Sequence, residues 1–148
     1  MLTELIVSLV VVAAFIGIYY ATTGILPGAT LIEQELPTGA SGGLNAGEAN
    51  LMFFYTTWCP YCHKAQDAWR SLEQLVKNNR YRYGGNIVTF EQINAESNKG
   101  KAALYNIKAY PTFKIETPTK LYEMVGAPTV SNFRTFLTKA LGSEKSSS

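Results

Sequence analysis

The sequence has 148 residues, 47% of them hydrophobic, and a formal net charge of only +2, which favours one globular domain with its own core. The basic residues are scattered and all lie at or after Lys64, so the charge pattern argues against a nucleic-acid-binding protein. Both cysteines lie in one short motif, which excludes a separate structural disulfide and assigns no redox compartment.

The chain opens with an uncharged run over residues 5–26, which is long enough to span the hydrocarbon core of a bilayer as a helix. We therefore expect residues 1–26 to form a single transmembrane anchor, with Tyr19 and Tyr20 near one interface between water and lipid. A cleaved signal peptide is the alternative, but it needs basic residues ahead of the apolar run, where the only charged side chain is Glu4. The acidic flank after the run favours a soluble domain on the non-cytosolic side of the membrane.

Glycine and proline are frequent in residues 27–49, which predicts a flexible linker that includes a short strand over 31–36. From residue 50 to 142, runs with the period of a strand alternate with runs with the period of a helix. Two parallel strands followed by a hairpin predict an α/β fold, a mixed sheet with helices on both faces. A polar tail is expected over 143–148. Strands are expected over 51–56, 86–94, 112–116 and 121–125, and helices over 60–79, 98–105 and 129–141.

The chemistry of the chain centres on two cysteines in the segment 53–63, FFYTTWCPYCH. A buried strand there delivers Cys59 to the first turn of a helix, where unpaired N–H groups and the helix dipole stabilise a thiolate. A thiolate is the nucleophile of thiol–disulfide exchange, and Cys62 lies one turn further on, where it can close a disulfide. Pro60 suits the first turn of a helix, because its missing N–H would have no partner there.

Three other interpretations of the motif are open at this point. With His63, the two cysteines match the C-x-x-C-H pattern of haem attachment. A zinc site would have only three ligands, because the chain has no other Cys or His. Two free cysteines also pack as small hydrophobes in a core. The position of the motif after a strand in an α/β pattern favours redox chemistry, with no metal and no cofactor.

Two segments of the chain resemble the thioredoxin and protein disulfide isomerase family. Residues 54–64, FYTTWCPYCHK, are similar to the active-site segment of the family, and residues 103–113, ALYNIKAYPTF, to the segment that carries its cis-proline. Gly126 fits the glycine that follows the last strand. The resemblance covers residues 50–142 and implies a thioredoxin-like fold.

The resemblance also implies roles for individual residues. Cys59 would be the attacking thiolate and the more exposed cysteine, and Cys62 the resolving one. The peptide bond before Pro111 would be cis, and its loop would offer backbone groups to an extended substrate. The substrate-binding residues implied by the resemblance are Trp58, Pro60, Tyr61, Tyr110, Pro111 and Thr112.

The chain departs from the family pattern at two positions near the motif. The family usually buries an acid at the position of Phe53 and places a basic partner at that of Phe90, so we expect the two rings to pack together. Asp67 also replaces a proline of the first long helix. Without a nearby acid to accept its proton, the Cys62 thiol is expected to have a raised pKa, and resolution should be slow at neutral pH.

These features predict a membrane-anchored thiol–disulfide oxidoreductase that acts on protein thiols and disulfides and contacts the lipid bilayer through residues 5–26. The alternative is a thioredoxin-fold structural or docking component of a membrane-associated assembly. Short anchored proteins of this type resemble ones encoded by large DNA viruses, whose virions contain an internal membrane. The expected location is therefore a cellular membrane, with the domain on its non-cytosolic side, or a virion internal membrane.

Overall fold

The computed structural model describes residues 1–23, 30–40 and 43–147. Its first element is the helix α1 (Leu2–Thr23), whose acidic first-turn residue is Glu4. Apolar side chains along this helix, such as Leu9 and Phe15, are exposed. Within the described ranges, no helix is long and apolar enough to cross a membrane. The span predicted over residues 5–26 is therefore not found there, and residues 24–26 lie outside the described ranges.

The remaining chain is organised around a five-stranded mixed sheet with the order β1-β6-β5-β2-β4. The parallel pair is β2 with β4, whereas β5 runs antiparallel to both β2 and β6. This arrangement confirms the predicted order of parallel strands first and a hairpin last. The strands of this sheet are β1 (Thr30–Gln34), β2 (Glu48–Tyr55), β4 (Ile87–Asn94), β5 (Thr112–Glu116) and β6 (Leu121–Val125).

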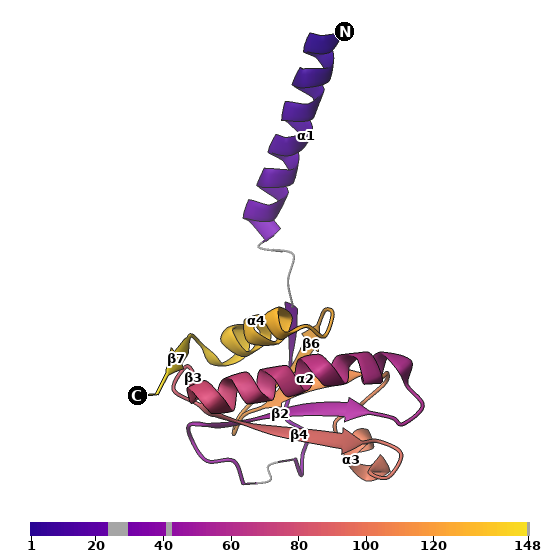
Figure 1. Cartoon of the computed structure of the whole chain (residues 1–148), viewed down its shortest axis with the longest axis vertical. Helices are drawn as coiled ribbons and strands as arrows, with labels where there is room; N and C mark the ends of the chain where they lie inside the picture. The colour runs from indigo at the N-terminus through magenta and orange to yellow at the C-terminus, as the bar shows by residue number, and fades with distance from the viewer. Residues whose placement is uncertain (24–29, 41–42, 148) are drawn as a thin grey trace.

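Three helices cover the two faces of the sheet, as predicted. The long helix α2 (Pro60–Asn79) and the C-terminal helix α4 (Val130–Leu141) lie together on one face (Figure 1). The short helix α3 (Lys99–Leu104) lies by the other face. Thr129 caps α4, because its hydroxyl accepts a hydrogen bond from the backbone N–H of Asn132 at 3.1 Å.

The central strand β2 supplies side chains to a core on each face of the sheet. Leu51 and Phe53 join the cluster formed with α2 and α4, whereas Met52 and Phe54 join the smaller cluster on the α3 side. Successive side chains of a strand point to opposite faces, and a strand covered on both faces is therefore apolar without interruption. This accounts for the continuous hydrophobic run that ends just before the cysteines.

The segment predicted as a flexible linker, residues 27–49, departs from that prediction where the structure describes it. Its strand β1 pairs antiparallel with β6, from Thr30 opposite Val125 to Gln34 opposite Leu121. Further along, Ala40 is buried in the core cluster on the α3 side. Pairing here covers the edge of β6, whose backbone groups would otherwise have no partners in the sheet.

The polar tail predicted over residues 143–148 also takes part in the fold. The strand β7 (Glu144–Ser146) pairs antiparallel with β3 (Tyr81–Tyr83), directly after α2. Neither strand was predicted, because three residues are too few to show a strand period. The C-terminal end of the described chain is therefore fastened to the end of α2.

Candidate active site

Cys59 and Cys62 are joined by a disulfide, with their Cα atoms 5.2 Å apart, which confirms the predicted pairing. Cys59 is the N-cap residue of α2, and Pro60 occupies the first turn. The Cys59 Sγ atom accepts a hydrogen bond from the backbone N–H of Cys62 at 3.1 Å. The sulfur therefore lies at the positive end of the helix dipole, where a thiolate is stabilised.

The two cysteines are equally buried, each with 3% of its surface exposed. The expectation that Cys59 is the more exposed member is therefore wrong for the disulfide form. Both residues belong to the core cluster on the α2 and α4 face, which explains their low exposure. The large side chains exposed next to them are Trp58 and Tyr61, at 68% and 69%.

The loop before β5 carries the predicted cis peptide bond, between Tyr110 and Pro111. The Tyr110 ring lies edge-on to that of Trp58, with their centroids 6.5 Å apart. The hydroxyl of Thr112 donates a hydrogen bond to the backbone oxygen of Ala109 at 2.6 Å and so closes this loop.

A groove of about 430 Å³ runs past the cis-proline. Of the six predicted substrate-binding residues, Tyr61 and Pro111 line it. Gly126 lines the groove too, and its φ of 141° is a backbone conformation that favours glycine. The groove is otherwise lined by Lys64, Phe113, Met124, Ala127, Pro128 and Thr129.

A second cavity, of about 300 Å³, is lined by Cys62 together with polar side chains. Two of these, Gln66 on α2 and Gln92 on β4, are hydrogen-bonded to each other at 2.6 Å. Another, His63, places its Nε2 atom 3.1 Å from the backbone oxygen of Thr57. The lining is completed by Tyr55, Thr56, Thr57 and Arg70.

Thr56 and Gln92 are among the residues of this cavity that sequence reasoning missed. Thr56 is buried, and among the described residues its hydroxyl has no hydrogen-bond partner. A threonine at the end of an apolar strand directly before the motif is the signal that marks it. Gln92 faces Phe53 in the register of β2 and β4, a pairing that the sequence alone does not reveal.

The position where the family usually buries an acid is filled by the fully buried Phe53. Its ring stacks on Phe113, with centroids 4.8 Å apart, and contacts Trp69 at 5.4 Å. Phe90 packs edge-on against the same Trp69 at 5.5 Å. The two rings expected to pack together are therefore bridged by Trp69, because Phe90 lies opposite Leu51 in the sheet register.

Glu96, in the loop after β4, is hydrogen-bonded to Thr57, in the loop between β2 and α2. Its carboxylate accepts hydrogen bonds from the Thr57 hydroxyl at 2.6 Å and from the Thr57 backbone N–H at 2.7 Å. These two hydrogen bonds hold the pKa of Glu96 below its usual value, and the bond from the hydroxyl is the larger cause. In the ranges that the structure describes, no group of three or more His, Cys, Asp or Glu side chains is placed to hold a metal ion.

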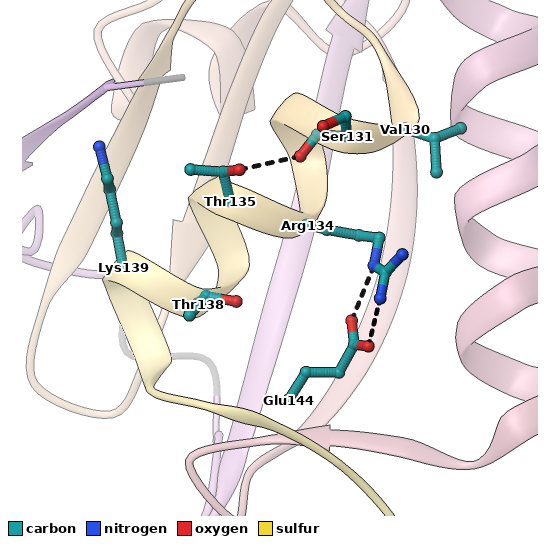
Figure 2. Close-up of a pocket in the computed structure, with 7 residues that line it drawn as sticks. All are labelled: Val130, Ser131, Arg134, Thr135, Thr138, Lys139 and Glu144. Atoms are coloured by element: carbon teal, nitrogen blue, oxygen red, sulfur yellow. Dashed lines mark hydrogen bonds and ion pairs between the residues drawn. The ribbon is translucent and has the colours of Figure 1, made fainter. Parts of the chain in front are cut away.

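A further pocket of about 650 Å³ lies along α4 and contains neither cysteine (Figure 2). Its charged residues include a close pair, since Arg134 donates two hydrogen bonds to the carboxylate of Glu144, at 3.0 and 2.6 Å. Tyr83 donates a third hydrogen bond to this carboxylate. The charged pair in this pocket therefore holds β7 in place and is not part of the redox site.

Comparison with known proteins gives the same family that the two motifs indicate. The family model described as Thioredoxin matches residues 44–139. Protein disulfide-isomerase 2-3 of Arabidopsis thaliana is 27% identical over 77 residues, which are 52% of this chain and 16% of that protein. Thioredoxin of Coprinus comatus is 26% identical over 84 residues, which are 56% of this chain and 73% of that protein.

Solved structures agree on the fold. Human ERp44 matches with a TM-score of 0.55 and 20% identity, over 65% of this chain and 28% of that chain. The first thioredoxin domain of mouse protein disulfide-isomerase A4 matches with a TM-score of 0.53 and 21% identity, over 62% of each chain. The present chain spans only 16% and 24% of the two plant protein disulfide isomerases that it matches.

Proposed function

Because this chain belongs to the thioredoxin family, we propose that it is a thiol–disulfide oxidoreductase that exchanges disulfides with cysteines of other proteins. The observation that carries the proposal is the Cys59–Cys62 disulfide at the N-cap of α2, in a chain that also has the cis bond before Pro111. A sulfur at this helix end is a good leaving group and a good nucleophile, because its thiolate form is stabilised.

In the reducing direction, the reaction begins with the dithiol form of the protein. The Cys59 thiolate attacks a substrate disulfide, forms a mixed disulfide and releases one substrate sulfur as a thiolate. Cys62 then loses its proton and attacks the Cys59 sulfur, which forms the Cys59–Cys62 bond and releases the second substrate thiolate. Two electrons pass to the substrate, and both substrate thiolates take protons from solvent. The oxidising direction is the reverse sequence.

The groove beside Pro111 suits an extended segment of a protein substrate. Its walls are mainly apolar, and Lys64 contributes a basic side chain to them. Trp58 and Tyr110 form an aromatic pair next to the motif. We propose that the substrate segment lies in this groove, with its cysteine sulfur directed at Cys59.

Trapping of mixed disulfides tests the function and the two cysteine roles. In Cys62→Ser, the mixed disulfide with a substrate protein has no resolving thiol and should accumulate, whereas Cys59→Ser should trap nothing. The double variant is the control for background disulfides. Trapping by Cys59→Ser alone would reverse the two roles, and trapping by neither single variant would contradict the proposed function.

We also propose that α1 attaches the domain to a membrane. The support is the uncharged sequence from residue 5 onward and the exposure of its described apolar side chains. Carbonate extraction of membranes that carry the full chain should leave it in the pellet, and a chain that starts at Thr30 should enter the supernatant. Release of the full chain would contradict the attachment. The side of the membrane, the virion setting and the structural role in an assembly stay predictions from the sequence.

A further inference from the structure

Thr56 holds a buried hydroxyl next to the redox pair. The residue is 3% exposed, and its Oγ1 atom has no hydrogen-bond partner within the described part of the chain. The residue lines the same cavity of about 300 Å³ as Cys62. Buried hydroxyls without a protein partner are usually satisfied by an ordered water when the site is polar and large enough. Both conditions are met here, because Gln66 and Gln92 also line the cavity.

Resolution of a mixed disulfide requires an acceptor for the Cys62 proton. Among the described residues, no carboxylate lines the cavity, and the position of the usual acid is the apolar Phe53. The titratable or charged side chains that line it are Tyr55 from β2 and His63 and Arg70 from α2. The strand β4 contributes the neutral Gln92, and Tyr110, from the loop before β5, packs against the core cluster that includes both cysteines.

Several other polar groups of the cavity are already engaged. The amides of Gln66 and Gln92 are hydrogen-bonded to each other at 2.6 Å. His63 is exposed, and its Nε2 atom lies 3.1 Å from the backbone oxygen of Thr57. The Thr57 hydroxyl donates to Glu96. The hydroxyl of Thr56, by contrast, has no hydrogen-bond partner among the described residues.

We propose that Thr56 holds a water in this cavity and that this water takes the proton of Cys62 during resolution. The inference rests on the proposed function, since it concerns the second step of the exchange. The Cys62 S–H bond breaks, and its proton passes to the water and on to solvent. The resulting thiolate forms the bond to Cys59 as the bond between Cys59 and the substrate sulfur breaks. Thr56 thus acts as a positioning residue in place of a buried acid.

The test compares Thr56→Val with Thr56→Ser in the full chain. Stopped-flow measurement of the decay of a mixed disulfide with a cysteine peptide, between pH 6 and 9, reports resolution directly. Thr56→Val should slow the decay about tenfold near pH 7 and move the rate profile to higher pH, since a positioned proton acceptor contributes at least this much. Thr56→Ser keeps the hydroxyl and should keep the rate. Thr138→Val, at an exposed threonine of α4, is the matched control.

Stability and the rate of the first step show whether Thr56 acts in proton transfer or only in folding. Thr56→Val keeps the shape of the side chain and removes no hydrogen bond to a described residue, so urea unfolding should show little loss of stability. Should it fail to fold, Thr56→Ala removes the same hydroxyl. Attack by Cys59, measured in a Cys62→Ser background, should be unchanged by Thr56→Val.

The outcomes are distinguishable. If Cys59 does not attack a peptide disulfide at all, the proposed function fails. If attack is normal and Thr56→Val resolves at the original rate across the pH range, proton transfer through a water held by Thr56 is overturned while the proposed function stands. An equal slowing of resolution by Thr56→Ser would assign the slowing to packing and would also overturn the proton transfer through this water. A pH profile of the resolution rate that changes in His63→Gln but not in Thr56→Val would overturn the role of Thr56 as well.

Discussion

Phe53 stands at the centre of a group of aromatic rings in the core that contains the redox pair. It contacts Phe113, Trp69 and Tyr55, with ring centroids 4.8, 5.4 and 5.6 Å away. The first contact is stacked and the other two are tilted, and aromatic contacts stabilise a core beyond the area that they bury. An acid at this position would therefore remove these packing contacts.

We expect Phe53→Asp to be strongly destabilising. Loss of a buried phenylalanine ring costs about 3–5 kcal/mol, and an unpaired buried carboxyl group adds to this cost. Phe53→Leu keeps an apolar side chain and should cost only about 1.5 kcal/mol or less. Urea unfolding followed by circular dichroism measures both variants. Equal unfolding midpoints for the two would show that a buried carboxyl group costs no more here than an apolar side chain.

At the scale of elements, the C-terminal strand β7 is fastened to the end of α2 by close backbone packing and one carboxylate. The backbone N–H of Gly84 donates to the oxygen of Ser143 at 2.9 Å. Glu144 accepts hydrogen bonds from both Arg134 and Tyr83. Burial, followed by the contact with Glu144, raises the pKa of Tyr83 far above its usual value, so the phenol keeps the proton that it donates.

Gly84→Ala should destabilise the protein more than Gly85→Ala. Gly84 has a φ of 56°, and a Cβ atom on it would lie 1.8 Å from the backbone oxygen of Leu141, which cannot move aside cheaply. Gly85 has a φ of 82° but open space around it, so alanine there adds only the left-handed strain of about 1–2 kcal/mol. The clash should add roughly 1–3 kcal/mol at Gly84. Urea unfolding of both variants checks the difference, and similar losses would contradict this close approach.

The Glu144 contacts should make stability depend on pH. Hydrogen bonds hold the pKa of Glu144 below its usual value, and the one from Arg134 contributes more than the one from Tyr83. A group with a lowered pKa in the folded state stabilises the fold above its unfolded pKa, about 4.3 for glutamate, and loses that contribution as the pH falls further. The midpoint temperature of thermal unfolding should therefore fall more steeply between pH 7 and 3 for the natural chain than for Glu144→Gln. Parallel curves would contradict the contribution of this pair.

At the scale of the whole molecule, the edge strand β1 completes the domain. Lys114 on β5 is fully buried, and its Nζ atom lies 2.6 Å from Gln34 Oε1 and 2.9 Å from Glu123 Oε2. Gln34 also donates to the Glu123 carboxylate at 3.1 Å. A buried charge needs such partners, because its desolvation is costly. The domain predicted to begin at residue 50 is therefore too short.

A chain of residues 30–148 should be clearly more stable than one of residues 50–148. Removing β1 takes away Gln34, the neutral hydrogen-bond partner of Lys114, and leaves its ion pair with Glu123. Loss of a hydrogen bond to a charged group costs about 1.5–3 kcal/mol. Gln34→Leu in the longer chain removes the same partner without removing the strand and should account for part of the difference. Urea unfolding of the three chains measures it. Equal stability of the two lengths would mean that β1 does not support the domain.

The sequence by itself determined the parts of this protein that depend on local pattern. The bounds predicted for β5, β6 and α2 agree with the structure, because each element combines a clear period with proline, glycine or polar residues at its ends. The redox pair and the cis bond before Pro111 followed from two contiguous segments and their resemblance to one family.

Only the tertiary structure decided how distant segments meet. Pairing of β1 with β6 and of β3 with β7 joins segments far apart in the chain, and short edge strands carry little pattern of their own. The same reason applies to the site, where the cavity at Cys62 is closed by Thr56 from β2's end and Gln92 from β4. Equal burial of the two cysteines likewise results from their place in the core cluster on the α2 and α4 face, which no local spacing encodes.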